Sequence, residues 1–292
     1  MNKATYTLGF IGIGLMGQPM TLRLLAAGYK VNIWNRSTDK LQTVTQAGAT
    51  QCDNIASLVS TSDIILLCLA DTPIVETIVK EHIIKHGNKG KLLIDLSSTH
   101  PEATRNLAQL LQDKCAMDWV DAPVSGGVAG ATNGTLAIMA GGNKEPIDIA
   151  RSILKPLYSQ FTHMGDVGSG QVTKVCNQMI VSCNVLVIAE MIALAEKSGV
   201  DASKIAGALA GGFADSKPLQ IVAPEMAAAR FTPVKWRVKT LLKDLNMATD
   251  LAEAQNTATP MSALAAQLMQ LHGSHGFLDQ DPSTLIKLYT NN

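Results

Sequence analysis

The sequence predicts an α/β protein in two parts, a parallel sheet with helices on both faces followed by an all-helical domain. In the first half, short apolar runs alternate with amphipathic ones, and after about Gly165 only helical spacing remains. Strands separated by helices are expected to lie parallel, because a parallel neighbour is reached through a crossover connection. The order of these two kinds of pattern therefore indicates the fold class.

Length and charge narrow the class of protein. The chain has 292 residues, with 24 Lys and Arg against 24 Asp and Glu. That length fits two domains at roughly 100–200 residues each, which we place at residues 1–165 and 166–292. Zero net charge argues against a nucleic-acid partner or a membrane surface, since both need clustered positive charge.

Six short apolar runs in the first part are typical of buried strands. Each of the first four is followed by a loop residue and a helical pattern, and the last closes on a pair of glycines. The predicted strands are Leu8–Ile11, Val31–Trp34, Ile64–Leu69, Leu92–Leu96, Trp119–Ala122 and Leu136–Ala140.

The second part begins with one long helical pattern. From Gln171 to Lys197 apolar residues recur at helical spacing without a proline or a glycine, and Ser198-Gly199 then gives a C-terminal stop. The remainder is typical of shorter helices, at Ser203–Leu209, Val234–Ala254, Met261–Leu271 and Pro282–Leu288.

The other composition signals predict a soluble cytoplasmic protein. Five widely spaced cysteines indicate reduced, mostly buried thiols. Residues 1–5 lead into a short apolar run that ends in glycines, unlike a signal peptide, and no apolar stretch reaches the ~18 continuous residues of a membrane span. The pairs His82/His86 and His272/His275 lack further ligands at zinc-like spacing, so we expect surface histidines and no metal site.

A glycine-rich loop directly follows the first predicted strand and precedes a helical pattern at Pro19–Ala27. In this order G-x-G-x-x-G predicts a Rossmann-type dinucleotide site: the glycines allow a tight turn, close approach of the pyrophosphate and close packing of helix on strand. The alternative is a glycine-rich turn of unrelated purpose. The predicted cofactor residues here are Gly12, Ile13, Gly14, Leu15, Met16 and Gly17.

The end of the second predicted strand indicates which cofactor binds. An acid about 20 residues after the loop would favour a free ribose 2′-hydroxyl, but this chain has Asn35-Arg36-Ser37 there. Arginine can pair with a 2′-phosphate, and Asn and Ser can donate hydrogen bonds to it. We therefore expect NADP(H) to be preferred over NAD(H); the alternative is a solvated loop arginine.

Two further segments carry candidate substrate groups. Lys174 and Asn177 lie three residues apart near the start of the long helix, so they share a face, and apolar neighbours would exclude water from the lysine. Ser125, Gly126 and Gly127 follow a predicted strand, where a hydroxyl and backbone N–H groups suit a carboxylate. The alternatives are a solvated surface lysine and a plain glycine-rich turn.

These residues carry a resemblance to the β-hydroxyacid dehydrogenases over essentially the whole chain. The family includes 3-hydroxyisobutyrate dehydrogenase, tartronate semialdehyde reductase and glyoxylate and succinic semialdehyde reductases. The resemblance rests on four ordered motifs, at Phe10–Gly17, Asp121–Gly127, Gly168–Asn177 and Lys243-Asp244-Leu245.

The resemblance implies an NAD(P)-dependent oxidoreductase that interconverts a small 3-hydroxy acid and its semialdehyde or oxo acid, as a homodimer or homotetramer. Lys174 matches the catalytic general acid and base, and Lys243 matches a lysine that closes the site. Substrate contacts fall on Ser125, Gly126, Gly127 and Asn177, and further cofactor contacts on Leu69, Ala70, Ser98 and Asp244.

The chain departs from the family in two places. Asn177-Gln178 stands where Asn-Asn is common and looks more like tartronate semialdehyde reductase, and Ala70 replaces the usual proline after Leu69. Two alternatives share the fold, an imine reductase-like enzyme and a non-catalytic interaction module, and Lys174 argues against both. A 6-phosphogluconate dehydrogenase would be longer. The substrate stays open among tartronate, succinic and methylmalonate semialdehydes and glyoxylate.

Overall fold

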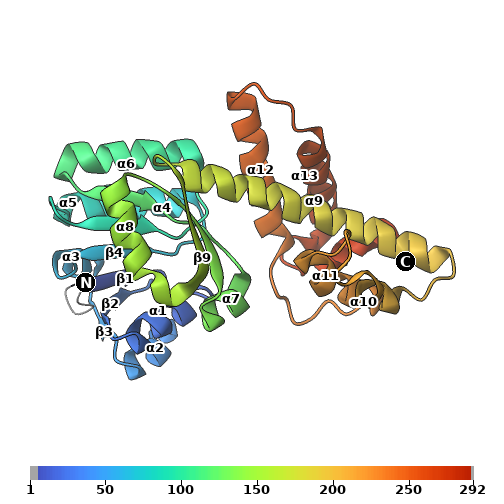
Figure 1. The fold of residues 1–292 in the computed structure, drawn as a ribbon, viewed down its shortest axis with the longest axis horizontal. Helices are drawn as coiled ribbons and strands as arrows, with labels where there is room; N and C mark the ends of the chain where they lie inside the picture. The colour runs from blue at the N-terminus through green and yellow to red at the C-terminus, as the bar shows by residue number, and fades with distance from the viewer. Residues whose placement is uncertain (1–5, 291–292) are drawn as a thin grey trace. The chain divides into compact units, whose positions relative to one another are not determined.

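The computed structural model describes residues 6–290, so the expectation made for residues 1–5 lies outside the described part of the chain. It divides into two compact units, Met1–Lys174 and Val175–Asn292, each of which is described by itself (Figure 1). We call them unit 1 and unit 2.

Unit 1 is built on one sheet whose described strands run in the order β3-β2-β1-β4-β5-β6-β8-β7, with β9 paired to β8. All strands from β3 to β6 are parallel, whereas β8 is antiparallel to β6 and β7 and parallel to β9. The strands are β1 Thr7–Ile11, β2 Lys30–Trp34, β3 Thr50–Gln51, β4 Ile64–Leu67, β5 Leu92–Asp95, β6 Asp118–Asp121, β7 Val124–Ser125, β8 Leu136–Gly141 and β9 Tyr158–Gly165.

The central strand β4 is apolar throughout because helices cover both faces of the sheet (Figure 1). Ile64 and Leu66 of β4 pack into the core on one face, and Ile65 and Leu67 pack into the core on the other. Alternating side chains of a strand point to opposite faces, so a four-residue strand contributes to two cores. The helices are α1 Gly17–Ala26, α2 Gln42–Gln46, α3 Ile55–Ser60, α4 Thr72–Ile78, α5 Ile84–His86, α6 Pro101–Cys115, α7 Gly127–Asn133 and α8 Lys144–Ile153.

Unit 2 consists of helices around one core. Its first helix, α9 (Ser169–Lys197), begins in unit 1 and continues without a break past the boundary between the units. The others are α10 Ile205–Leu209, α11 Lys217–Ala227, α12 Val238–Ala254 and α13 Pro260–His272, with a 3₁₀ segment at Pro282–Leu288. Buried residues of α9, α11, α12 and α13 form the core.

Helix α9 is long and apolar enough to cross a membrane by length and composition, and no other described helix is. Within its apolar window 44% of the residues are buried, and side chains such as Leu186 and Ile192 belong to the core of unit 2. Such a helix is weak evidence for a membrane span, because the core helix of a soluble protein meets the same criteria.

Several elements were not expected. The strands β3, β7 and β9 and helix α11 are absent from the predicted set; β9 is largely exposed, and α11 carries Pro218 in its first turn and Pro224 inside it. The segment Pro282–Leu288 is a 3₁₀ helix rather than an α-helix.

Two expectations about burial were wrong. His272 is buried rather than on the surface, because its ring stacks on Phe277 and its Nε2 bonds the Thr284 hydroxyl at 2.9 Å. The cysteines are not mostly buried: four are half-buried and Cys176 is exposed.

Candidate active site

The predicted cofactor residues of unit 1 lie at one edge of the sheet. Gly12, Asn35, Leu69 and Ser98 come after β1, β2, β4 and β5, which are parallel neighbours. Their carboxyl ends therefore meet at the same edge. Strands β1 and β4 are adjacent there, at the point where the strand order changes direction, and open sheets bind ligands at such a point.

The three glycines of the loop differ in what surrounds them. A Cβ at Gly12, whose φ is +104°, would lie 2.2 Å from the carbonyl oxygen of Cys68, and one at Gly17 would lie 2.0 Å from that of Gly12. A Cβ at Gly14 would meet no atom within 4 Å. The first and third glycines thus allow the chain to pack, and the second keeps the backbone open to a ligand. This arrangement fits the pyrophosphate of a dinucleotide at the start of α1.

Asn35 joins two of the loops at this edge. Its Oδ1 accepts the backbone N–H of Ile13 at 3.0 Å, and its Nδ2 donates to the carbonyl oxygen of Ser37 at 2.8 Å. Similarly, the backbone N–H of Leu69 donates to the Ser97 hydroxyl at 2.9 Å, which ties the loop after β4 to the loop that carries Ser98. Asn35 therefore orients the glycine loop, while Arg36 next to it is exposed.

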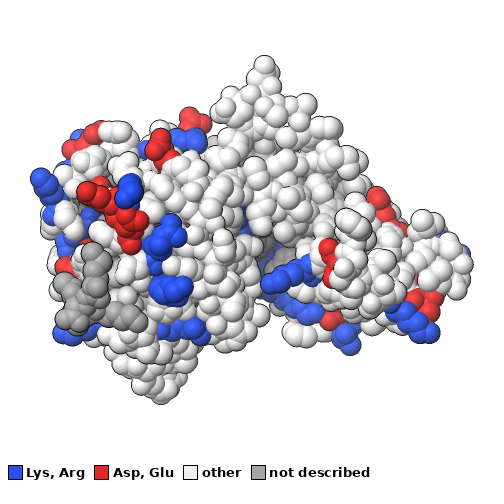
Figure 2. Space-filling view, in the orientation of Figure 1, with Lys and Arg blue, Asp and Glu red and all other residues white. Residues whose placement is uncertain are grey.

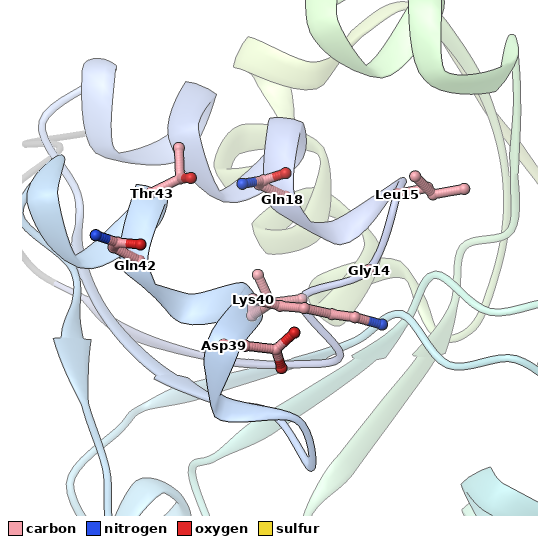
Figure 3. Close-up of a pocket in the computed structure, with 8 residues that line it drawn as sticks. Gly14, Leu15, Gln18, Asp39, Lys40, Gln42 and Thr43 are labelled. Carbon is pink, nitrogen blue, oxygen red and sulfur yellow. The ribbon is translucent and has the colours of Figure 1, made fainter.

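A hollow of about 250 Å³ lies beside the glycine loop (Figure 3). Its lining includes Ile13, Gly14 and Leu15, which were predicted, together with Gln18, Asp39, Lys40, Gln42 and Thr43, which were not. Figure 3 shows Lys40 extending beside Gly14, with Asp39 next to it. In the sequence, only the closeness of Lys40 to Arg36, four residues earlier, could have indicated that Lys40 lies near the cofactor loop. Figure 2 shows acidic and basic side chains mixed over the visible face of each unit.

The predicted carboxylate-binding segment contains a short strand. Val124 and Ser125 form β7, which pairs with β8, and Gly127 begins α7. Ser125 is half-buried, whereas Gly126 (φ +136°) and Gly127 (φ +63°) are exposed. Two exposed glycines directly after Ser125 leave this segment accessible to a bound molecule.

The first turn of α9 is held by Asp121, a buried residue that the sequence analysis did not assign to the site. Its Oδ1 accepts the N–H of Gly168 at 2.8 Å, and its Oδ2 accepts that of Gln171 at 2.9 Å. The side chain of Gln171 accepts from the Thr99 N–H and donates to the Ser97 carbonyl oxygen. Lys174 therefore follows, within one turn, a segment fixed to the carboxyl edge of the sheet.

Asp121 also stands beside a second buried carboxyl group, Asp95, its partner in the β5–β6 register. Burial raises the pKa of Asp95 to about 7, although hydrogen bonds from Ser97 and Thr99 oppose the shift and the charge of Asp121 adds to it. Burial also raises the pKa of Asp121, against the hydrogen bonds from the first turn of α9. Both carboxyl groups are fully buried, so they hold the surrounding loops by hydrogen bonds and do not contact solvent.

Lys174 is 9% exposed, which agrees with the expectation that little water reaches it. Asn177 follows three residues later on α9 and is half-buried; Gln178 follows four residues later and is buried. Positions i+3 and i+4 both lie on the face of residue i. The sequence analysis named Asn177 for the site and treated Gln178 only as a departure from the family pattern.

Within unit 2, four polar side chains form a continuous chain. The Asn177 Nδ2 donates to the Gln178 Oε1 at 2.7 Å, and the Gln178 Nε2 donates to the Asp244 Oδ2. The Asp244 Oδ1 lies 3.2 Å from the Lys243 Nζ. The carboxylate is almost fully buried, while the lysine side chain is 30% exposed. We call these four residues the amide chain; it connects two predicted substrate contacts, Asn177 and Lys243.

Comparison with known proteins shows the family to which the chain belongs. Residues 7–165 match the model described as the NAD binding domain of 6-phosphogluconate dehydrogenase, and residues 168–289 match the NAD-binding model of NADP-dependent 3-hydroxyisobutyrate dehydrogenase. The chain is 34% identical to the 2-hydroxy-3-oxopropionate reductase of Escherichia coli K12, over 96% of each chain. The chain belongs to the β-hydroxyacid dehydrogenase family.

Other members of the family agree. The 3-hydroxyisobutyrate dehydrogenase of Pseudomonas aeruginosa is 31% identical, over 97% of this chain and 98% of the relative. A solved structure, Mycobacterium tuberculosis 3-hydroxyisobutyrate dehydrogenase with L-serine, is 27% identical with a TM-score of 0.88 and covers 98% of this chain and 99% of the other. This β-hydroxyacid dehydrogenase is thus an NAD(P)-dependent oxidoreductase, and the predicted fold class is confirmed.

Proposed function

We propose that this β-hydroxyacid dehydrogenase interconverts a small 3-hydroxy acid and its semialdehyde or oxo acid, with Lys174 as the general acid and base. The observation that carries the proposal is the placement of Lys174: a lysine that is 9% exposed, one turn beyond a helix start fixed by Asp121. An enclosed ammonium can give its proton to a developing alkoxide and recover it in the reverse direction. The fixed helix start limits the positions that the amine can reach.

The substrate contacts follow from groups that suit an anion. Ser125 and the backbone N–H groups of Gly126 and Gly127 would hold the carboxylate, because a hydroxyl and backbone N–H groups can donate hydrogen bonds to an anion and both glycines are exposed. Asn177 and Lys243 of unit 2 are the remaining proposed substrate contacts, carried over from the family pattern. The domain boundary that we propose stays between residues 165 and 166.

The cofactor residues are proposed on the same basis. When bound, the nicotinamide supplies or accepts the hydride. The open backbone at Gly14 receives the pyrophosphate, and Arg36 pairs with a 2′-phosphate, so NADP(H) is preferred over NAD(H). Lys40 lines the hollow beside the glycine loop and adds positive charge there, although Asp39 next to it partly offsets that charge. Leu69, Ala70, Ser98 and Asp244 are the remaining proposed contacts, carried over from the family pattern.

We propose a cytoplasmic homodimer or homotetramer. In support, Ile180, Val187 and Leu194 of α9 are each more than half exposed and lie seven residues apart, so they form one apolar stripe. The substrate is drawn from tartronate, succinic and methylmalonate semialdehydes and glyoxylate. NADPH oxidation rates on a panel of these four compounds distinguish them.

The test of the central role is Lys174→Ala. Removing the proton donor should lower kcat by about a hundredfold to ten-thousandfold on the best of the four substrates. NADPH binding, followed by fluorescence, should hardly change, because the glycine loop holds the phosphates. Lys174→Arg should not restore turnover, since a guanidinium with a pKa above about 12 keeps its proton at neutral pH.

The matched control is Lys197→Ala, which removes an exposed lysine from the last turn of the same helix. It should retain wild-type turnover. Near-normal single-turnover hydride transfer by Lys174→Ala would show that the proton comes from another group and would refute the proposed role.

A further inference from the structure

In the amide chain of unit 2 every hydrogen bond is donated toward Asp244: Asn177 donates to Gln178, and Gln178 donates to Asp244. We call this the direction of the chain, and it determines which atom of Asn177 is left for the substrate. We propose that Gln178 is a positioning residue: anchored by Asp244, its amide turns the carbonyl oxygen of Asn177 toward the substrate. The site then favours a substrate whose α-carbon carries a hydroxyl over one that carries a methyl. This inference rests on the proposed function, in which Asn177 contacts the substrate.

The direction is fixed at the buried end. An ionised carboxylate can only accept hydrogen bonds, so Asp244 requires Gln178 to present its amide nitrogen. Two amide orientations are otherwise nearly equal in shape, but the other one would set the Gln178 oxygen against the carboxylate oxygen. Gln178 and Asp244 are both buried, so such a repulsion would not be relieved by water.

The Lys243 ammonium, 3.2 Å from Asp244, strengthens the anchor. A buried carboxylate is tolerated when it is paired and hydrogen-bonded, and here one oxygen faces the lysine while the other takes the Gln178 amide. Both of these partners are donors, so the carboxylate of Asp244 acts here as an acceptor. Asp244 therefore sets the position of Lys243 and the orientation of Gln178 together.

The orientation of the Gln178 amide in turn fixes the orientation of the Asn177 amide. With its nitrogen committed to Asp244, Gln178 offers Oε1, and the Asn177 Nδ2 donates to it at 2.7 Å. The Oδ1 of Asn177 is then on the side of the amide away from Gln178. Asn177 is half-buried, so a bound molecule can approach it. A carbonyl oxygen accepts from a hydroxyl but has no favourable interaction with a methyl group.

The substrate preference can be measured on a pair that differs only in this group. Glycerate and 3-hydroxyisobutyrate carry a hydroxyl and a methyl on the same carbon, and both are oxidised at the neighbouring CH₂OH. One satisfied hydrogen bond is worth about 1 kcal/mol, so kcat/KM should favour glycerate by at least about fivefold to tenfold. Gln178→Met, which keeps the length but removes the amide, should bring this ratio toward one.

A second variant tests the direction itself. Gln178→Glu keeps the shape, and a protonated carboxyl can still donate to Asp244 and accept from Asn177. Once ionised it can only accept, and two carboxylates then face each other, which raises the pKa of the introduced group above its ordinary ~4.3. Relative to wild type, kcat/KM of Gln178→Glu should therefore fall by at least about tenfold as pH rises past that pKa. Gln178→Met should show no such additional fall.

The control is Gln112→Glu, the same chemical change at an exposed position of α6, whose activity should follow the wild-type pH profile. A readout independent of turnover is the free energy of unfolding. In Gln178→Glu it should decrease with rising pH, relative to wild type, because the folded state disfavours the second charge.

The outcomes separate the two proposals. A wild-type enzyme inactive on every hydroxy acid and semialdehyde would refute the proposed function, while the unfolding measurement would still test the amide chain. An active enzyme whose Gln178→Glu variant keeps the wild-type dependence of activity and of unfolding on pH would overturn the role of Gln178. An unchanged glycerate preference in Gln178→Met would do the same.

Discussion

Arg36 and His272 can both carry a positive charge, but one is exposed and the other is buried. Arg36 is exposed at the carboxyl edge of the sheet, where its charge is available to a ligand. His272 is buried in unit 2, where its charge would be costly. We therefore expect Arg36 to affect cofactor binding and His272 to affect the stability of the fold.

Arg36→Ala should raise the KM for NADPH by roughly tenfold to a hundredfold and leave the KM for NADH nearly unchanged. A charged pair with a phosphate is worth about 1.5–3 kcal/mol, and NADH has no 2′-phosphate. Initial rates with each cofactor measure both constants. Equal use of NADPH and NADH by the unmodified enzyme would contradict the preference.

His272 should make the stability of the protein depend on pH. Burial lowers its pKa from 6.5 to about 4, and the positive charges of His275 and Lys287 add to the shift. Between these values the unfolded chain binds a proton that the folded chain does not, so stability is fully present above about pH 6.5 and is lost as pH falls toward 4. The loss is on the order of 3 kcal/mol, at about 1.4 kcal/mol per pKa unit.

Urea unfolding at pH 5 and pH 7.5 should show about 2 kcal/mol of this loss, because pH 5 still lies about one unit above the pKa of the folded state. His272→Gln, which can keep a hydrogen bond to Thr284, should reduce the difference between the two pH values. The exposed His275→Gln is the matched control and should leave most of that difference in place. An undiminished difference in His272→Gln would show that other groups cause the pH dependence.

At this scale the loop glycines and Lys174 could be predicted from the sequence because their motifs are local. It did not identify Asp121 or Gln178, whose importance depends on partners 47 and 66 residues away. A buried acid at the end of a strand and an amide beside a lysine have no signature of their own. His272 was misjudged for the same reason, because Thr284 and Phe277 lie beyond its own helix.

The first turn of helix α9 is held by a side chain from outside the helix. Asp121 of β6 accepts two N–H groups from the start of this helix, at 2.8 and 2.9 Å. The first N–H groups of any helix have no partner within it and need one elsewhere. Here a strand residue supplies it, so the sheet determines where the helix with Lys174 begins.

Asp121→Asn should lower both stability and turnover. An amide has one oxygen, so one of the two buried N–H groups would face an NH₂ donor, at a cost of about 1–3 kcal/mol. Thermal unfolding and kcat should both decrease, with the KM for NADPH little changed. Asp118→Asn, at an exposed position of the same strand, should behave like wild type. If Asp121→Asn matched it, the carboxylate would not hold the helix.

The sequence predicted elements where the pattern is long or strongly apolar. The six predicted strands and the helices at residues 171–197, 234–254 and 261–271 are all found within a few residues of their expected bounds. Strand β9 was missed because most of its side chains are exposed, so it lacks an apolar run. Helix α11 was missed because its two prolines are typical breakers, although one is tolerated in the first turn.

The whole molecule combines the two cores of unit 1 and the main core of unit 2 with helix α9, which crosses the boundary between the units. Strands and helices of unit 1 are typical of dinucleotide binding, and unit 2 presents α9 and α13 with exposed apolar side chains such as Leu194 and Met261. A large exposed apolar surface is typical of contact with another protein chain. The proposed homo-oligomer would cover it.

Leu194→Lys should shift the molecular mass in solution from the oligomer toward the monomer. The side chain is 68% exposed, so the substitution should cost the folded chain little, whereas a lysine buried between two subunits would lose its hydration. Light scattering after size exclusion measures the mass. Lys197→Ala is a control on the same helix. An unchanged oligomer would exclude this stripe from the interface.

The glycines of the loop are constrained in two different ways, by the packing of the chain itself and by access for a ligand. At Gly12 and Gly17 a larger residue collides with the chain's own carbonyl oxygens, so the identity of these residues is required for the protein to exist in its folded form. At Gly14 an added methyl group would meet no atom of the chain within 4 Å, so the fold itself does not require a glycine there. A need for glycine at this position would therefore come from a bound molecule, as the proposed pyrophosphate contact predicts.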